Sequence, residues 1–313
     1  MRLRRVVSVA VLAYLSLTVL TGIFLCEATL HPLRRPLTSD DGTQARELAA
    51  AHRATLRDVS LQTSDHITLR AWLFAPDNPN SNAVILLHGL SDNRVGMTGY
   101  AELLLDHSYS VLMPDARAHG ASDGAPATYG LVERDDIHQW FNWLTSSEHP
   151  ACIYGVGESM GAAQLLQSLA VEPRFCAVVA ESSFSDFREI AYDRVGQFFH
   201  TGPWLGRTAF RPAIETAFAY ARWKYHLDLT EVSPETAVAA SQVPVLLIHG
   251  IEDRNIPVRH GRRIAARNPK VVLWQVPNTD HCGAFSATPR EFERKLLQWF
   301  SSTPEKRPLS SET

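Results

Sequence analysis

Short apolar runs alternate with longer segments of helical periodicity along most of this chain of 313 residues. The runs have the length and composition of strands that are covered on both faces. They occupy residues 59–63, 67–74, 83–87, 109–113, 152–156, 176–180, 243–248 and 271–276. The first two predict a hairpin, because a short polar turn separates them and the second alternates apolar with polar residues.

Helical patterns fall between the strand-like runs, with apolar positions recurring along one side. Helices are expected at residues 43–53, 100–105, 131–144, 162–170 and near the end of the chain, where Phe292, Leu296, Leu297 and Phe300 recur. A hairpin followed by repeated strand–helix units predicts a mostly parallel sheet sandwiched by helices. In such sheets, ligands bind beyond the carboxyl ends of the strands.

An insertion at residues 182–242 interrupts this alternation and is rich in aromatic residues. They include Phe184, Phe187, Phe198, Phe199, Trp204, Phe210, Phe218, Tyr220, Trp223 and Tyr225. These side chains are expected either to line a substrate pocket or to pack the insertion onto the domain, and both interpretations stay open.

The N-terminus carries three arginines, and residues 6–26 that follow contain no charge. As a helix, this segment spans roughly 30 Å, enough to cross a bilayer. It lacks the small-x-small exit of a cleaved signal peptide, and the residue before Cys26 is not the small one expected in a lipoprotein. We therefore expect a retained single-pass signal anchor. The arginines at 2, 4 and 5 favour a cytoplasmic N-terminus with the rest of the chain outside, although Arg34 and Arg35 weaken this bias.

The amino-acid composition limits the kinds of binding partner and cofactor that we expect. The net charge of −3 gives no indication of nucleic-acid binding. The four cysteines lack C-x-x-C spacing, so no zinc site is expected; they are Cys26, Cys152, Cys176 and Cys282. Cys152 and Cys176 fall on strands that can be neighbours, but two free thiols are the favoured expectation because a disulfide demands specific geometry. No metal motif or phosphate-binding loop occurs, and no cofactor is expected.

Residues 153–161 run from an apolar strand through a glycine-flanked turn into a helix. Within them Gly157-Glu158-Ser159-Met160-Gly161 fits the G-x-S-x-G pattern that exposes a serine nucleophile on a strained turn. The residues two positions from the serine must be small, and the following helix N-terminus favours a developing oxyanion. An ordinary turn with a buried serine is the alternative interpretation of this motif alone.

A serine nucleophile needs a base, and the base needs a carboxylate that orients it. His281 is the candidate base, in a loop after the last strand, and Asp253 is the candidate carboxylate, directly after another strand. Glu181 ends an earlier strand and is a competing carboxylate, although Asp253 is favoured. All these residues are expected at the same edge of the sheet.

The order Ser159, Asp253, His281 resembles that of the α/β hydrolases, and the resemblance covers residues 58–302. His88-Gly89-Leu90 is similar to the family's HG element. The resemblance therefore implies that the backbone N–H groups of Leu90 and Met160 form an oxyanion hole.

A second group of motifs resembles the branch of serine aminopeptidase-like and small-lid esterase proteins. Residues 115–124 fit its D-x-R-x-H-G-x-S-x-G stretch, and Tyr129-Gly130, Glu133 and Asp136 also agree with it. These segments are expected to brace the sheet edge through hydrogen bonds without taking part in the chemistry.

The sequence thus predicts an α/β-hydrolase fold with a helical lid insertion and an N-terminal transmembrane helix. Its expected parts are a basic N-terminus at 1–5, an anchor at 6–26, a linker at 27–57, the hydrolase domain at 58–302 and a tail at 303–313. The expected activity is hydrolysis of carboxylesters through an acyl-enzyme, on a small-molecule or lipid-like acyl substrate. A peptidase or amidase with the same triad and a non-catalytic binding module are the alternatives, and the oligomeric state stays open.

Overall fold

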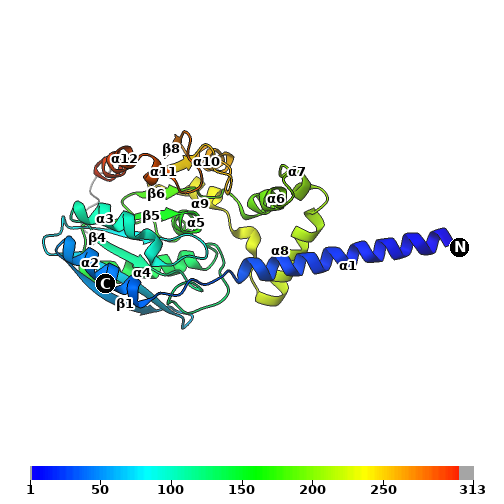
Figure 1. The fold of residues 1–313 in the computed structure, drawn as a ribbon, viewed down its shortest axis with the longest axis horizontal. Helices are drawn as coiled ribbons and strands as arrows, with labels where there is room; N and C mark the ends of the chain where they lie inside the picture. Colours follow the sequence, from blue (N-terminus) through cyan, green and yellow to red (C-terminus); the bar gives the residue numbers. More distant parts are fainter. Residues whose placement is uncertain (1, 303–313) are drawn as a thin grey trace. The chain divides into compact units, whose positions relative to one another are not determined.

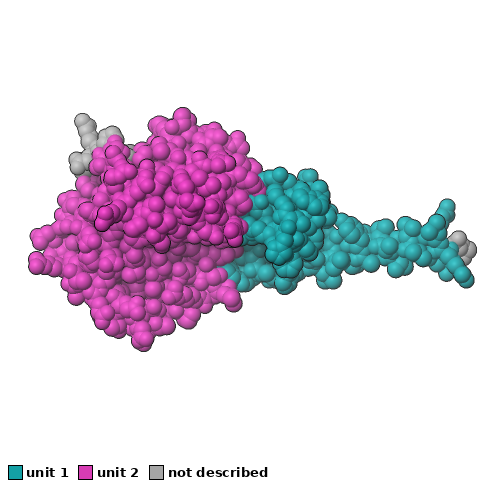
Figure 2. Space-filling model, turned by 45° about the horizontal axis from the view of Figure 1, so that its top comes forward, with its two compact units in different colours: residues 1–32, 186–232 teal, residues 33–185, 233–313 magenta. Residues whose placement is uncertain are grey.

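The computed structural model describes residues 2–302, which form two compact units (Figure 2). The sheet unit comprises residues 33–185 and 233–302, and the helical unit comprises residues 2–32 and 186–232. The predicted C-terminal tail, 303–313, lies outside the described residues.

The sheet unit is built on one sheet of eight strands (Figure 1). They are β1 (Ala54–Gln62), β2 (Thr68–Pro76), β3 (Asn82–Leu87), β4 (Ser110–Pro114), β5 (Cys152–Glu158), β6 (Val178–Glu181), β7 (Val245–Gly250) and β8 (Val271–Val276). Their order is β1-β2-β4-β3-β5-β6-β7-β8. The β1–β2 hairpin and the β2–β4 pair are antiparallel, and every other pair is parallel, which confirms the predicted hairpin and mostly parallel sheet.

Three strands, β1, β6 and β7, begin two or more residues away from the starts that the pattern predicts. β1 begins five residues before the predicted 59, because Ala54 already pairs with Pro76 of β2. As an edge strand β1 is only partly buried, so its first half carries no apolar run. β7 begins two residues later than predicted, at Val245, directly after Pro244, which has no N–H for a ladder hydrogen bond.

Helices cover both faces of the sheet (Figure 1). Those of the sheet unit are α2 (Ser39–Ala51), α3 (Thr98–Asp106), α4 (Glu133–Glu148), α5 (Met160–Ser168), α9 (Pro234–Ala240), α10 (Arg259–Ala265), α11 (Ala284–Ala287) and α12 (Pro289–Ser301), with a 3₁₀ turn η1 (Arg94–Met97). One buried cluster contains Leu104 of α3 and Phe292 of α12 against the sheet. The other contains Trp140 of α4 and Leu165 of α5. The predicted sandwich is therefore confirmed.

Cys152 and Cys176 form a disulfide, so the expectation of two free thiols is wrong. Cys152 begins β5, and Cys176 precedes β6 by two residues on the neighbouring chain segment. The N–H of Cys176 donates to the carbonyl of Ile153 at 2.9 Å, which brings the two Cα atoms within 5.9 Å. That separation suits a disulfide, and sequence spacing alone does not reveal it.

The helical unit contains α1 (Arg2–Leu30), α6 (Phe187–Phe198), α7 (Trp204–Arg207) and α8 (Arg211–Tyr225), with a 3₁₀ turn η2 (Leu229–Glu231). The first part of α1 is exposed, and its last three turns bury one side through Gly22, Cys26 and Leu30. Within residues 2–302, α1 is the one helix long and apolar enough to cross a membrane. Figure 2 shows it projecting from the body of this unit.

Candidate active site

Three side chains predicted from the sequence meet at the carboxyl edge of the sheet. Ser159 follows β5, Asp253 follows β7 and His281 follows β8. Nε2 of His281 lies 2.9 Å from Oγ of Ser159, and its Nδ1 lies 2.8 Å from Oδ2 of Asp253. One imidazole thus joins the hydroxyl to the carboxylate within hydrogen-bond distance at both ends.

The backbone at Ser159 has the strain expected of a sharp strand-to-helix turn. Its φ of 51° and ψ of −113° lie outside the regions that L-residues normally adopt. A Cβ at Gly157 would lie 2.7 Å from the Gly161 carbonyl, and one at Gly161 would lie 2.3 Å from the Leu87 oxygen. Both neighbours must therefore be glycine. The N–H of Ser159 donates to the carbonyl of Glu181 at 2.9 Å and fixes the turn to β6.

Asp253 is held so that one oxygen is left for His281. Oδ1 of Asp253 accepts the N–H groups of Asn255 at 2.9 Å and Ile256 at 2.7 Å, and Oδ2 faces His281. Burial opposes ionisation of Asp253, but hydrogen bonds from His281, Ile256 and Ser182 together lower its pKa below the ordinary value. The carboxylate is therefore ionised at neutral pH and can stabilise an imidazolium.

Ser182 and His249, which the sequence analysis did not single out, position the loops that carry His281 and Asp253. Oγ of Ser182 accepts the N–H of Cys282 at 3.2 Å, next to His281. His249 donates from Nε2 to the Ile256 carbonyl at 2.7 Å, and burial lowers its pKa, so it packs as a neutral ring beneath the Asp253 turn. Neither has a sequence signal beyond its place at a strand end.

Glu181, the competing carboxylate, is occupied elsewhere. Its Oε2 accepts the hydroxyl of Tyr100 at 2.9 Å, and its Oε1 accepts the N–H of Ala284 at 2.8 Å. Burial raises the pKa of Glu181 despite these hydrogen bonds. The geometry therefore joins Asp253, and not Glu181, to His281. Tyr100 is a further residue of the site that sequence reasoning missed.

The two expected oxyanion donors belong to segments on either side of Ser159. Gly89 lies so close that a Cβ built on it would come within 3.7 Å of the Ser159 Cβ, and Leu90 follows it directly. Met160 begins α5 and is buried. The structure thus places both segments next to the serine.

His88, next to these donors, is a structural residue. Its Nδ1 donates to the carbonyl of Gly89 at 2.8 Å, and its Nε2 accepts the N–H of Ala116 at 3.1 Å. Burial, followed by the proximity of His119, lowers the pKa of His88 to about 4. The ring is therefore neutral at neutral pH, and its two hydrogen bonds link the β3 and β4 turns.

The D-x-R-x-H-G-x-S-x-G stretch braces the edge as predicted. Asp115 accepts the Arg94 N–H and guanidinium, each at 2.8 Å, and the Ala121 N–H at 2.7 Å. Arg117 donates to Asp136 at 2.7 and 2.6 Å, on the start of α4. Gly120 has a φ of +48°, and a Cβ there would lie 2.2 Å from the Asp115 carboxylate, so glycine is required.

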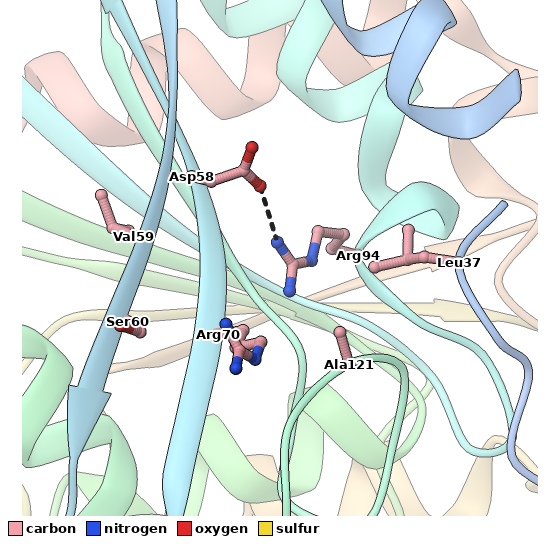
Figure 3. Close-up of a pocket in the computed structure, with 7 residues that line it drawn as sticks. All are labelled: Leu37, Asp58, Val59, Ser60, Arg70, Arg94 and Ala121. Carbon is pink, nitrogen blue, oxygen red and sulfur yellow. Dashed lines mark ion pairs between the residues drawn. The ribbon is translucent and has the colours of Figure 1, made fainter. Parts of the chain in front are cut away.

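A cavity of about 120 Å³ opens beside this brace, and it shares no lining residue with the Ser159 group (Figure 3). Its lining residues are Leu37, Asp58, Val59, Ser60, Arg70, Arg94 and Ala121. Nη1 of Arg94 lies 4.0 Å from the Asp58 carboxylate, and its Nη2 is paired with Asp115. The Arg94 guanidinium is thus paired with carboxylates on two sides. Among residues 2–302 no cluster of His, Cys, Asp or Glu suited to a metal ion occurs.

The family follows from this fold and a comparison of sequences. Residues 84–295 match the model of the alpha/beta hydrolase family, so the chain belongs to that family and is a hydrolase by class. The uncharacterized protein YqkD of Bacillus subtilis is 29% identical over 241 residues, which cover 74% of each chain.

Solved structures share the fold. The Pyrococcus furiosus esterase Pf2001 superposes with a TM-score of 0.68 at 24% identity, covering 88% of this chain and 98% of that one. A puromycin-hydrolyzing peptidase of Mycobacterium tuberculosis superposes with a TM-score of 0.64 at 17% identity, covering 81% of this chain and 40% of that one. At these identities the likeness concerns the fold alone.

Glu158, the residue before Ser159, has a strongly perturbed acidity. It is only partly exposed, and burial, followed by the charges of Glu181 and Asp92, raises its pKa from 4.5 to about 7. The folded state therefore holds a proton that the unfolded chain releases at lower pH. The stability contributed by this group is complete below pH 4.5 and is lost as the pH rises through about 7.

Replacing Glu158 with glutamine should flatten the pH dependence of stability. Between pH 5 and pH 8 the wild type should lose about 2 kcal/mol more unfolding free energy than Glu158→Gln, since each unit of pKa shift is worth about 1.4 kcal/mol. Denaturant unfolding at several pH values in detergent measures the difference. Glu102→Gln, at an exposed carboxylate of α3, is the control and should follow the wild type. Equal slopes for Glu158→Gln and wild type would contradict the assignment.

Proposed function

We propose that this protein is a serine hydrolase that cleaves carboxylesters, with Ser159 as nucleophile, His281 as base and Asp253 as the carboxylate that orients it. The continuous hydrogen-bonded series from the Ser159 hydroxyl through both nitrogens of His281 to Asp253 carries this proposal. Such a series is the arrangement that activates a serine hydroxyl, whose own acidity is too weak for attack at neutral pH.

The reaction proceeds in two halves. Oγ of Ser159 attacks the acyl carbon while Nε2 of His281 takes its proton, and the N–H groups of Leu90 and Met160 stabilise the negative oxygen. His281 then gives the proton to the departing alcohol as the ester C–O bond breaks, which leaves an acyl-serine. Water, deprotonated by His281, attacks the acyl-serine and releases the acid with regeneration of Ser159. Asp253 keeps its negative charge throughout and stabilises the imidazolium.

An ester substrate is favoured over an amide by the more complete of the two structural likenesses. The Pyrococcus esterase is matched over 98% of its chain, whereas the mycobacterial peptidase is matched over 40%. The same triad can serve an amidase, so amides belong in the assay beside esters. A purely binding role has no supporting observation, because every member of the triad is present and in hydrogen-bond contact.

Three variants test the catalytic assignment. Ser159→Ala and Asp253→Asn should each lower ester turnover by at least about a thousandfold, because one removes the nucleophile and the other the charge that holds the base. Glu181→Gln is the matched control, a carboxylate at the neighbouring strand end that does not bond to His281. It should keep at least about ten times the rate of Asp253→Asn. Turnover is measured with esters of increasing acyl length and with aminoacyl amides.

Retention of a tenth of the wild-type rate by Ser159→Ala would exclude the nucleophile assignment. A greater loss in Glu181→Gln than in Asp253→Asn would move the acid to β6. Faster hydrolysis of amides than of matched esters would keep the triad but change the substrate class.

We also propose that α1 is a retained membrane anchor and that the rest of the chain lies outside the cytoplasm. Two observations support retention. Gly22, Cys26 and Leu30 are buried, so removal of α1 would expose the apolar surface that they cover. Glu27 accepts Nζ of Lys224 at 2.7 Å and the hydroxyl of Tyr225, and these bonds hold the last turn of α1 against α8.

The disulfide supports an extracytoplasmic location. Cys152 and Cys176 are both buried beside the central strands, and disulfides persist mainly in oxidising compartments. The disulfide is evidence independent of the arginines around α1. Three arginines precede the span and two follow it, so their distribution alone favours this orientation by a small margin.

Protease treatment of intact cells or spheroplasts tests this location. External protease should digest the domain, and the undigested protein should fractionate with membranes and begin before residue 6. A soluble mature protein that begins near Glu27 would show that α1 is a cleaved signal peptide. Complete protection from external protease would place the domain in the cytoplasm, and reduced thiols at Cys152 and Cys176 would accompany that result.

A further inference from the structure

α1 and α8 run in the same direction within the helical unit. A Cβ on Gly22 would lie 2.6 Å from the Ala213 carbonyl oxygen and from Thr216, so Gly22 faces the first turns of α8. Five residues later, Glu27 contacts Lys224 and Tyr225 in the last turn of α8. The start of α8 therefore lies beside the part of α1 from which the exposed apolar segment extends, and its end lies farther away.

The length of the exposed segment brings the start of α8 close to the lipid. Residues 6–20 of α1 are apolar or uncharged and mostly exposed, and they measure about 22 Å as a helix. A bilayer's hydrocarbon core is about 30 Å thick. Residues 21–26 supply the remaining length of the span, and this part of α1 packs on α8. When α1 spans the membrane, the first turns of α8 consequently lie at the level of the lipid headgroups or just below.

Four aromatic side chains, three exposed and one half-buried, gather at this end of α8. Phe210 is the residue before α8, and its ring lies 5.0 Å from that of Phe199, which in turn lies 5.0 Å from Phe198. Trp204 begins α7, which is joined to the start of α8 through the bond from the Phe210 N–H to the Leu205 carbonyl at 3.1 Å. Phe198 is 78% exposed and Trp204 is 59% exposed. We call Phe198, Phe199, Trp204 and Phe210 the aromatic end.

Charge at the aromatic end suits a phospholipid surface. Arg207 ends α7, where it pairs with Glu189, and Arg211 begins α8; both arginines are exposed. Arginine side chains beside interfacial aromatic rings reach phosphate groups while the rings occupy the boundary between headgroups and acyl chains. An aromatic residue in water gains free energy by entering that boundary.

We propose that the aromatic end is a lipid-contacting surface that seats the helical unit in the outer face of the bilayer spanned by α1. The partner is therefore the membrane itself, through its phospholipid headgroups and upper acyl chains. This inference rests on the proposed anchor and is independent of the proposed esterase chemistry. Trp223 supplies an internal contrast, because it is 75% exposed but lies in the last turn of α8, away from this end.

Tryptophan quenching by brominated lipid tests the proposal on the full chain. The protein is placed in phosphatidylcholine–phosphatidylglycerol nanodiscs, with or without bromine on the acyl carbons nearest the headgroup. The chain has seven tryptophans, of which Trp204 and Trp223 are in the helical unit and none is in α1. Wild type should be quenched by the brominated lipid, and Trp204→Phe should lose that quenching by at least about fivefold. Trp223→Phe should keep it.

A second variant adds a tryptophan at the aromatic end, where Trp204→Phe removes one. Phe198→Trp should increase the quenched emission, because position 198 is also at the aromatic end. Undiminished quenching in Trp204→Phe, or loss of quenching in Trp223→Phe, would overturn the proposal. Absence of the wild-type protein from the nanodisc fraction would overturn both this inference and the anchor. Ester turnover measured on the same samples tests the catalytic proposal separately, since none of these variants changes Ser159, Asp253 or His281.

Discussion

The close contact between the end of β3 and the start of α5 is the constraint on which the site depends. Gly161 leaves no room for a side chain against the Leu87 and His88 carbonyls, and Gly157 leaves none against Gly161. Only this approach allows the chain to turn at Ser159 with strained angles and to aim a helix N-terminus at its hydroxyl. The parallel sheet supplies the rest, because β7 and β8 end at the same edge and deliver Asp253 and His281 from there.

Hydrogen bonding and burial together decide which carboxyl groups near the serine are ionised. Asp253 stays ionised because two backbone N–H groups and His281 bind its carboxylate. Glu158 has fewer such partners and two acidic neighbours, so its pKa rises to about 7. Similar carboxyl groups within one site thus acquire opposite acidities from their surroundings. That separation leaves a single carboxylate to pair with the catalytic imidazole that we propose.

The sequence predicted the sheet, its hairpin and the residues that meet at Ser159, because apolar runs and glycine-flanked turns report local structure directly. It did not predict the bond between Cys152 and Cys176, which depends on strand pairing. Nor did it predict that α1 packs on α8. In a uniformly apolar helix, the stripe formed by Gly22, Cys26 and Leu30 has no polar contrast to mark it. Tyr100 and Ser182 were missed because they act through tertiary contacts alone.

Covalent labelling by a fluorophosphonate probe tests the central claim most directly, because the probe reacts only with a serine hydroxyl that a neighbouring base has activated. The full-length protein in detergent is treated with the probe, digested and mapped by mass spectrometry. The proposed mechanism predicts one modified peptide, with the phosphonyl group on Ser159, and no reaction after prior denaturation. Absence of labelling in the folded protein, or modification at another serine with Ser159 untouched, would contradict it.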